Sequence, residues 1–392
     1  MRRCGVVLSL MITLLCTMVG ESRAQNSDAT PPMTAEQFVA AGNKYAIAKQ
    51  YDQAVDAYRQ ALKLKPDLAT AYHGLGSVYV NMGRNAEALE HLRAATRLDP
   101  ENPLAHLNLG INLANLRRGD EAMLEFNEAK RLRPQDARVY NEIGNALHNV
   151  YGRFEEALEA YKEARRLNPN VPAVHHNIGL MLVRLGKGAE AIAPFEEALR
   201  LNPNYQNARY LLSSAYSRAG RYEEAVDSFT KFLQLRPRGR DALQNRAWNL
   251  MYLGGKGEAA AADALQFLEV AGWRDGASQF MVLIAHLGYR QAGRTAEAQK
   301  ALEEAGKNCD TSAWPYPVIR CLRGEISSEE LLQAANDTGK KTEAHTYLGM
   351  DLLLKGRSVE AREHFAWVKE YGNHRFLEHP LALAELNRLG ER

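Results

Sequence analysis

Small and apolar residues recur along the chain with a period of about 34 residues, and within each period they fall at helical spacing. Six prolines close consecutive periods at intervals of 34, 34, 35, 34 and 34 residues: Pro66, Pro100, Pro134, Pro169, Pro203 and Pro237. A first small position is held by Gly42, Gly76, Gly110, Gly144, Gly179 and Ser213. A large apolar position follows, held by Tyr58, Leu92, Phe126, Tyr161, Phe195 and Phe229. A second small position holds Ala61, Ala95, Ala129, Ala164, Ala198 and, as the exception, Phe232. Such a fixed period indicates a repeat array.

Each period predicts two helices joined by a short turn. In the second period the first helix carries Tyr72, Leu75 and Tyr79 on one face. Gly83 follows it, where glycine favours a left-handed helix end. The second helix stops at Pro100, because proline cannot continue a helix interior. The small positions predict close helix crossings that leave no room for a larger side chain.

The pattern resembles the tetratricopeptide repeat family, with six consecutive repeats over residues 35–239. The resemblance implies an all-α fold, a right-handed superhelix or α-solenoid of helix-turn-helix repeats. It also implies that the first helix of each repeat lines a concave face. The fourth repeat contains one extra residue, near Val150, Tyr151 and Gly152.

The C-terminal third continues the repeats in a weaker form, since Trp248 adds bulk and His286 occupies a first small position. We expect two degenerate helix pairs over 240–307, a linker with a short helix over 308–341, a further repeat over 342–373 and a capping helix over 374–392. A capping box at Ser327 and Glu330 would start the short helix. This end is similar to periplasmic repeat adaptors of the new lipoprotein I family, through Tyr347 to Gly349 and Phe376 to Leu386.

Residues 1–24 have the layout of a secretory signal peptide, with a charged start and an apolar stretch of about 14 residues. Ser22 and Ala24 are the small residues that a signal peptidase requires, so we expect cleavage after Ala24. An uncleaved membrane anchor is a second reading, although a spanning helix needs about 20 apolar residues. Lipidation at Cys16 is a third, although no small residue precedes that cysteine. A flexible segment over 25–34 would follow. Cleavage predicts a periplasmic or secreted protein, bacterial in origin, with no stable membrane insertion.

Cleavage also changes the charge of the chain. The full chain has 49 Lys and Arg and 47 Asp and Glu. The first 24 residues include three basic residues and one acidic residue, so the mature chain has 49−3=46 basic and 47−1=46 acidic residues. A net charge of zero provides no long-range attraction to nucleic acid. We therefore expect no nucleic-acid partner.

The mature chain keeps Cys309 and Cys321, and the sequence leaves open whether they form a disulfide or stay as thiols. No catalytic motif, phosphate loop or zinc helix occurs in the sequence. His175 and His176 are adjacent, so they point to different faces of a helix, and no further ligand lies at useful spacing. We expect no catalytic residue, no bound metal and no cofactor.

The resemblance places groove-lining residues at −6, −3, −2, +1 and +4 from the first small position. In the third repeat this rule selects an apolar stripe of Leu104, Leu107 and Ile111 beside Asn108. Exposed apolar clusters often mark partner sites. The rule also selects Arg138, Asn141, Asn145, His176, Asn177, Val183, Asn207, Tyr210 and Ser214. Carboxamides donate and accept hydrogen bonds, so the asparagines could hold a peptide backbone.

These features predict a non-catalytic protein-interaction scaffold of the cell envelope, which binds an extended polypeptide in its concave groove. Arg138 is the single basic residue among these lining positions, so a ligand with a carboxylate-rich tail is not expected. Self-association into a homo-oligomer through the degenerate repeats is a second class. An enzyme with a hidden site in 240–341 is a third, and a β-sheet there would favour it.

Overall fold

The computed structural model describes residues 32–390, and over this range the chain is all-helical. It forms 21 α-helices and one π-helix within the described range, with no strand there. The predicted all-α repeat fold is thereby confirmed. The predicted signal peptide over 1–24, and most of the segment over 25–34, lie outside the described residues. Among the described helices, none is long and apolar enough to cross a membrane.

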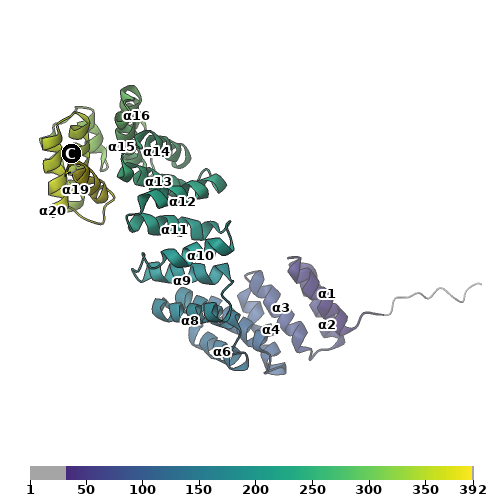
Figure 1. Ribbon diagram of the computed structural model, residues 1–392. Helices are drawn as coiled ribbons and strands as arrows, with labels where there is room; N and C mark the ends of the chain where they lie inside the picture. Colours follow the sequence, from purple (N-terminus) through teal and green to yellow (C-terminus); the bar gives the residue numbers. More distant parts are fainter. Residues whose placement is uncertain (1–31, 391–392) are drawn as a thin grey trace, which may run out of the picture. The chain divides into compact units, whose positions relative to one another are not determined.

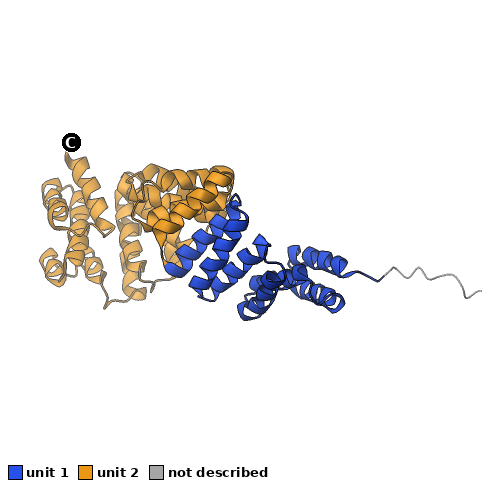
Figure 2. Ribbon diagram, turned by 90° about the horizontal axis from the view of Figure 1, so that it is seen from below, with its two compact units in different colours: residues 1–151 blue, residues 152–392 orange. Residues whose placement is uncertain are grey.

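The chain divides into two compact units, residues 1–151 and 152–392, which are coloured separately in Figure 2. Unit 1 consists of successive helix pairs (Figure 1). Its helices are α1 (Ala35–Ile47), α2 (Tyr51–Leu64), α3 (Ala69–Asn81), α4 (Asn85–Leu98), α5 (Pro103–Asn115), α6 (Gly119–Leu132), α7 (Ala137–Ala146) and the π-helix η1 (Leu147–Tyr151).

Unit 2 begins with helix α8, which is followed by the helix pairs α9/α10 and α11/α12. The helices from α13 to α21 then form a less regular C-terminal block. Its helices are α8 (Phe154–Leu167), α9 (Pro172–Arg184), α10 (Ile192–Leu201), α11 (Gln206–Arg218), α12 (Tyr222–Leu235), α13 (Arg240–Leu253), α14 (Gly257–Ala271), α15 (Ser278–Gln291), α16 (Thr295–Asn308), α17 (Tyr316–Leu322), α18 (Ser328–Ala334), α19 (Thr338–Leu354), α20 (Ser358–Tyr371) and α21 (Glu378–Gly390).

At several first small positions glycine is required because an aromatic ring of the paired helix fills the adjacent space. A Cβ atom on Gly110 would lie 2.6 Å from Cε1 of Phe126, which is closer than non-bonded carbons approach. Gly179 meets Phe195 at the same 2.6 Å, and Gly349 meets Phe365 likewise. The predicted close crossings are therefore confirmed in both units.

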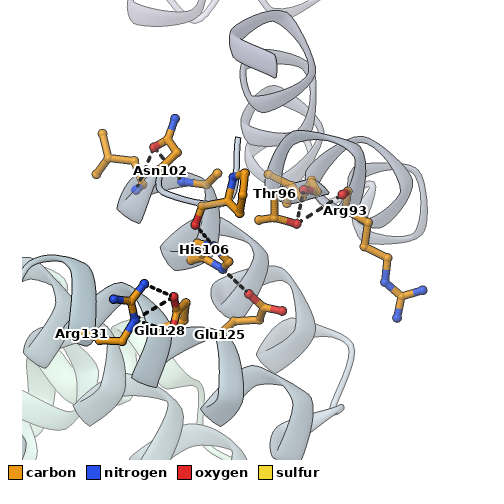
Figure 3. A network of polar contacts seen from close by, with 11 residues as sticks. Arg93, Thr96, Asn102, His106, Glu125, Glu128 and Arg131 are labelled. Atoms are coloured by element: carbon orange, nitrogen blue, oxygen red, sulfur yellow. Dashed lines mark hydrogen bonds and ion pairs between the residues drawn. The ribbon is translucent and has the colours of Figure 1, made fainter. Parts of the chain in front are cut away.

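Four of the prolines that end repeats are tied to the next first helix by a recurring hydrogen bond. His106 on α5 bonds through Nε2 to the Pro100 carbonyl at 2.9 Å and through Nδ1 to Glu125 at 2.6 Å (Figure 3). The same bond to a proline carbonyl recurs six residues after three further prolines, from Tyr140 to Pro134, His175 to Pro169 and Arg209 to Pro203. These carbonyls would otherwise lack a helical partner. His175 thus has a structural role.

The extra residue of the fourth repeat is accommodated by the π-helix η1, which continues α7 directly. A π-helical turn takes one residue more than an α-helical turn, so it absorbs an insertion without breaking the helix. The boundary between the two compact units falls at its end, between Tyr151 and Gly152. A single added residue therefore marks where the chain divides.

The C-terminal block departs from a simple repeat array. A short helix, α17, lies within the region expected to be mainly linker, before the helix α18 that the capping box of Ser327 and Glu330 begins as predicted. The last helix, α21, packs against α19 and α20 and also returns to α13. Tyr252 on α13 donates a hydrogen bond of 3.0 Å to the Leu377 carbonyl. The end of the chain therefore closes this block onto α13.

Cys309 and Cys321 are free thiols, so the disulfide that the sequence left open is absent from the structure. Cys309 is the C-cap of α16, and burial raises the pKa of its thiol to about 11. Cys321 lies on α17, where its side chain contacts Ser328. Each thiol thus lies in its own packing environment.

Candidate peptide-binding groove

A pocket of about 450 Å³ lies in unit 2 between the first helices of successive repeats. The residues around it come from α9, α11, α12 and α13: His176, Asn207, Tyr210, Leu211, Phe232, Arg236, Gly239, Arg240, Asp241 and Ala242. His176, Asn207 and Tyr210 are among the lining residues expected from the sequence. The structure thus brings three of those residues to one pocket, which we call the groove pocket.

His176 contributes a buried imidazole to the groove pocket. It is 9% exposed, and its Nδ1 has no hydrogen-bond partner among the described residues. Its ring lies 5.0 Å from that of Tyr205 and 5.9 Å from that of Phe195. Burial lowers the pKa of His176 below its usual 6.5, so the ring is neutral at pH 7. An unpaired ring nitrogen is a group that a ligand can satisfy.

Tyr210 forms the opposite wall and is held by aromatic neighbours. Its ring meets Phe229 edge-on at 6.0 Å and Phe232 at 5.6 Å. Its hydroxyl oxygen accepts a hydrogen bond of 3.3 Å from the Asn245 amide, and burial raises the pKa of the hydroxyl. The phenol therefore stays neutral and fixed, with one face toward the pocket.

The rim of the groove pocket is polar, with its charges largely paired. Arg240 forms ion pairs with Asp241 at 2.8 Å and with Asp275 at 2.9 Å. Arg236 lies at the turn between α12 and α13. An aromatic floor within a balanced rim suits an apolar side chain better than a charged one.

A second pocket of about 440 Å³ continues along α11 and shares Tyr210 and Leu211 with the groove pocket. Val183 and Ser214, two more residues predicted to line the groove, belong to it. Together the two pockets form an elongated groove across α9 and α11. This shape can accept an extended segment with two anchoring side chains.

The predicted apolar stripe of unit 1 is not an exposed surface. Leu107 is 5% exposed and therefore part of the core, while Leu104 and Ile111 are half-buried. The repeat rule describes one helix pair, but α5 also packs against α3 and α7. The expectation that Leu107 is exposed is wrong for the described structure, and its contact with a partner stays a prediction.

The predicted asparagines take part in contacts within the fold. Asn108 on α5 donates to His73 at 2.8 Å and to Ser77 at 2.7 Å, so it joins neighbouring first helices of unit 1. Asn141 and Asn145 both donate to Glu142 at 3.0 Å. Asn177 in unit 2 is half-buried and also engaged. Their use as a ladder for a peptide backbone stays a prediction.

Arg138 is also engaged, in an ion pair of 2.6 Å with Asp136. The sequence reasoning missed the walls supplied by Phe232 and by the turn from Arg236 to Asp241. A signal for Phe232 was present, because it replaces the alanine that the other five repeats have at the second small position. Its added bulk builds one wall of the groove pocket.

The helix pairs, their glycine crossings and the groove between first helices define a tetratricopeptide-repeat protein. The sequence profile described as the cilia and flagella-associated protein 70 C-terminal domain matches residues 13–250, well over half of the chain. The chain belongs to this family.

The chain also resembles individual proteins. It is 29% identical to the lipoprotein NlpI homolog of Haemophilus influenzae over 153 residues, which cover 37% of this chain and 47% of that protein. The chain thus spans about half the length of this curated relative. The crystal structure of YrrB, a TPR protein with an unusual peptide-binding site, is 25% identical and covers 44% of this chain and 89% of its own, with a TM-score of 0.36. The Pseudomonas aeruginosa pilF structure is 24% identical, and the match covers 60% of this chain and 97% of that protein, with a TM-score of 0.41.

Proposed function

We propose that this chain is a non-catalytic scaffold that binds an extended segment of a partner protein in the groove of unit 2. The observation that carries the proposal is the pair of adjoining pockets on α9 and α11, which share Tyr210 and Leu211. A protein groove of this kind is lined by apolar residues with a few placed polar groups. The buried, unpaired Nδ1 of His176 is such a group.

The partner segment is expected to carry an aromatic or aliphatic anchor for the groove pocket. The aromatic side chains of the groove pocket are uncharged, and Arg240 at the rim is already paired with Asp241 and Asp275, so a strongly acidic or basic anchor is not favoured. A second anchor, two or more residues along, would occupy the pocket beside Val183 and Ser214. We place the protein in the cell envelope, a proposal supported by the signal-like N-terminus and by the similarity to a lipoprotein.

The proposal is tested with a library of random 12-residue peptides selected on the full chain. The selected peptides should share a large apolar residue, and Tyr210→Ala should weaken their binding at least tenfold. Tyr371→Ala is the matched control, since Tyr371 is an exposed tyrosine elsewhere in unit 2. Equal affinity for wild type and Tyr210→Ala would show that the groove is not the binding site.

Self-association stays a prediction beside this proposal, and it is checked by the solution mass at several concentrations. Leu107→Asp, a natural first choice from the sequence, is unsuited to testing the groove. It would place a charge in the core of unit 1, where burial of an unpaired carboxylate is costly.

A further inference from the structure

A further pocket, of about 350 Å³ and separate from the groove, lies in the C-terminal block of unit 2. Its aromatic side chains are Trp248, Phe280 and Phe376, and its polar residues are Gln244, Glu343, Arg375 and Glu378. Gln244 and Trp248 come from α13, Phe280 from α15 and Glu343 from α19. These four residues occupy the −3, +1, −6 and −6 lining positions of their helices, counted from Ala247, His286 and Gly349. We call it the carboxylate pocket.

Two buried carboxyl groups face this pocket from different helices. Glu343 is 3% exposed and Glu378, in the first turn of α21, is 2% exposed. Glu343 accepts a hydrogen bond from the Trp314 indole, and Glu378 accepts one of 3.0 Å from the Tyr347 hydroxyl. A carboxylate has room for about four hydrogen bonds, so these donors leave most of the accepting capacity of the pair unused.

The surroundings favour the protonated form of these carboxyls. Burial, followed by repulsion from Glu378, raises the pKa of Glu343 to about 8, and burial raises the pKa of Glu378 to about 7. The other titratable or charged groups facing them are Asp337 and Lys340 near Glu343, Tyr252 and Tyr347 near Glu378, and Arg375 on the pocket wall. Both carboxyl groups therefore keep their protons to a higher pH than exposed carboxyl groups do.

Trp248 gives an independent indication of a ligand. It lines the pocket and is 2% exposed, and its indole Nε1 has no hydrogen-bond partner among the described residues. Buried donors in folded proteins are nearly always satisfied. A carbonyl oxygen of a bound molecule would satisfy this one.

We propose that the carboxylate pocket binds a basic side chain, best an arginine, of a partner polypeptide. A guanidinium group can pair with two carboxylates at once through its planar set of donors. Aromatic walls attract the same cation through their faces. The main-chain carbonyl beside the arginine provides the acceptor that Trp248 lacks. This site is separate from the groove and takes a ligand of opposite character.

Calorimetry of the full chain with three small probes tests the proposal. N-acetylarginine amide has the cation and the carbonyls, N-acetylcitrulline amide lacks the charge, and n-butylguanidine has the single cation but lacks the carbonyls. The arginine probe should bind more tightly than either of the others, and its affinity should rise at least tenfold from pH 6 to pH 8, with release of a proton. This sign follows because the cation binds the ionised carboxyls, which dominate only as pH rises past their raised pKa values.

The result that overturns the proposal is equal binding of the arginine and citrulline probes at pH 8, or no heat with any probe. Binding of n-butylguanidine as tight as that of the arginine probe would show that a guanidinium cation alone, and not a polypeptide residue, is recognised. Glu343→Gln should weaken arginine binding at least tenfold and abolish its proton release. Glu363→Gln, an exposed residue on α20, is the matched control. If Glu343→Gln does not fold, the comparison of the three probes on the wild-type protein still decides whether the pocket recognises an arginine residue.

Discussion

The groove and the carboxylate pocket use the same positions of the same kind of helix, yet they offer opposite chemistry. The groove has Tyr210 and a neutral, buried His176, with its charges paired at the rim. The carboxylate pocket has aromatic walls around Glu343 and Glu378. Helix α13 contributes to both, with Asp241 at one and Trp248 at the other. The repeat framework therefore fixes where a site can form, and single residues decide what it binds.

The largest expected effect comes from removing the wall that distinguishes the groove. Phe232→Ala restores the alanine of the other repeats and leaves a cavity beside Tyr210, so it should lower the free energy of unfolding by about 3 kcal/mol. Peptide binding at the groove should be lost as well, because the pocket loses its wall. Chemical denaturation and peptide titration measure the two effects.

Val368 is the matched control for Phe232, because both residues lie 19 positions after the first small residue of their repeats, Gly349 and Ser213. Val368 is fully buried, so Val368→Ala should cost roughly 2 kcal/mol. It should leave peptide binding unchanged, since it does not line the groove. Loss of peptide binding in both variants would mean that stability, and not the wall, controls the groove.

The two sites should respond to pH in opposite directions. The pKa of Glu343 is raised to about 8, so its contribution to stability is full below pH 4.5 and is lost as pH rises through about 8. The pKa of His176 is lowered by burial, so its contribution is present above pH 6.5 and is lost as pH falls through the lowered value. High pH therefore lowers the contribution of Glu343 to folding stability, and low pH lowers the contribution of His176. This effect on stability is separate from the rise in arginine binding with pH.

Unfolding free energies of Glu343→Gln and His176→Asn, each compared with wild type at pH 5 and pH 8.5, isolate these contributions. Glu343→Gln should gain stability relative to wild type at the higher pH, by on the order of 2 kcal/mol. His176→Asn should gain stability relative to wild type at the lower pH. Differences that do not depend on pH in either variant would contradict the assigned burial.

Local features of the fold could be predicted from the sequence, because each depends on one helix pair. The glycines opposite Phe126, Phe195 and Phe365 are of this kind, as are the left-handed glycines that follow first helices. Features that depend on a third helix could not be predicted. Leu107 follows the rule for an exposed position, but it is buried on α5, a helix that also packs against α3 and α7.

The residues of the two candidate sites also differ in whether their position in the sequence could predict them. His176, Asn207 and Tyr210 lie on first helices and could be selected by position. Glu343 occupies the same kind of position, but its proximity to Glu378 depends on the packing of α21 against α19. The pocket they share with Trp248 also needs the return of α21 to α13, a contact across more than 100 residues. No spacing in the sequence encodes that contact. The carboxylate pocket therefore became visible only in three dimensions.

The smallest expected effect concerns the turns on which both sites depend. Gly186 beside the groove has φ 75° and Gly356 in the C-terminal block has φ 77°, and a Cβ atom would meet no neighbour at either. The cost of alanine there is purely conformational, about 1 kcal/mol, and should be equal at both sites. Lys49 holds the same left-handed turn in unit 1 without glycine, at φ 59°. Lys49→Gly should therefore stabilise the protein by about as much as Gly186→Ala and Gly356→Ala each destabilise it, as measured by thermal unfolding. A cost that differed between the two glycine variants would show that the helical framework is not the same beneath the two sites.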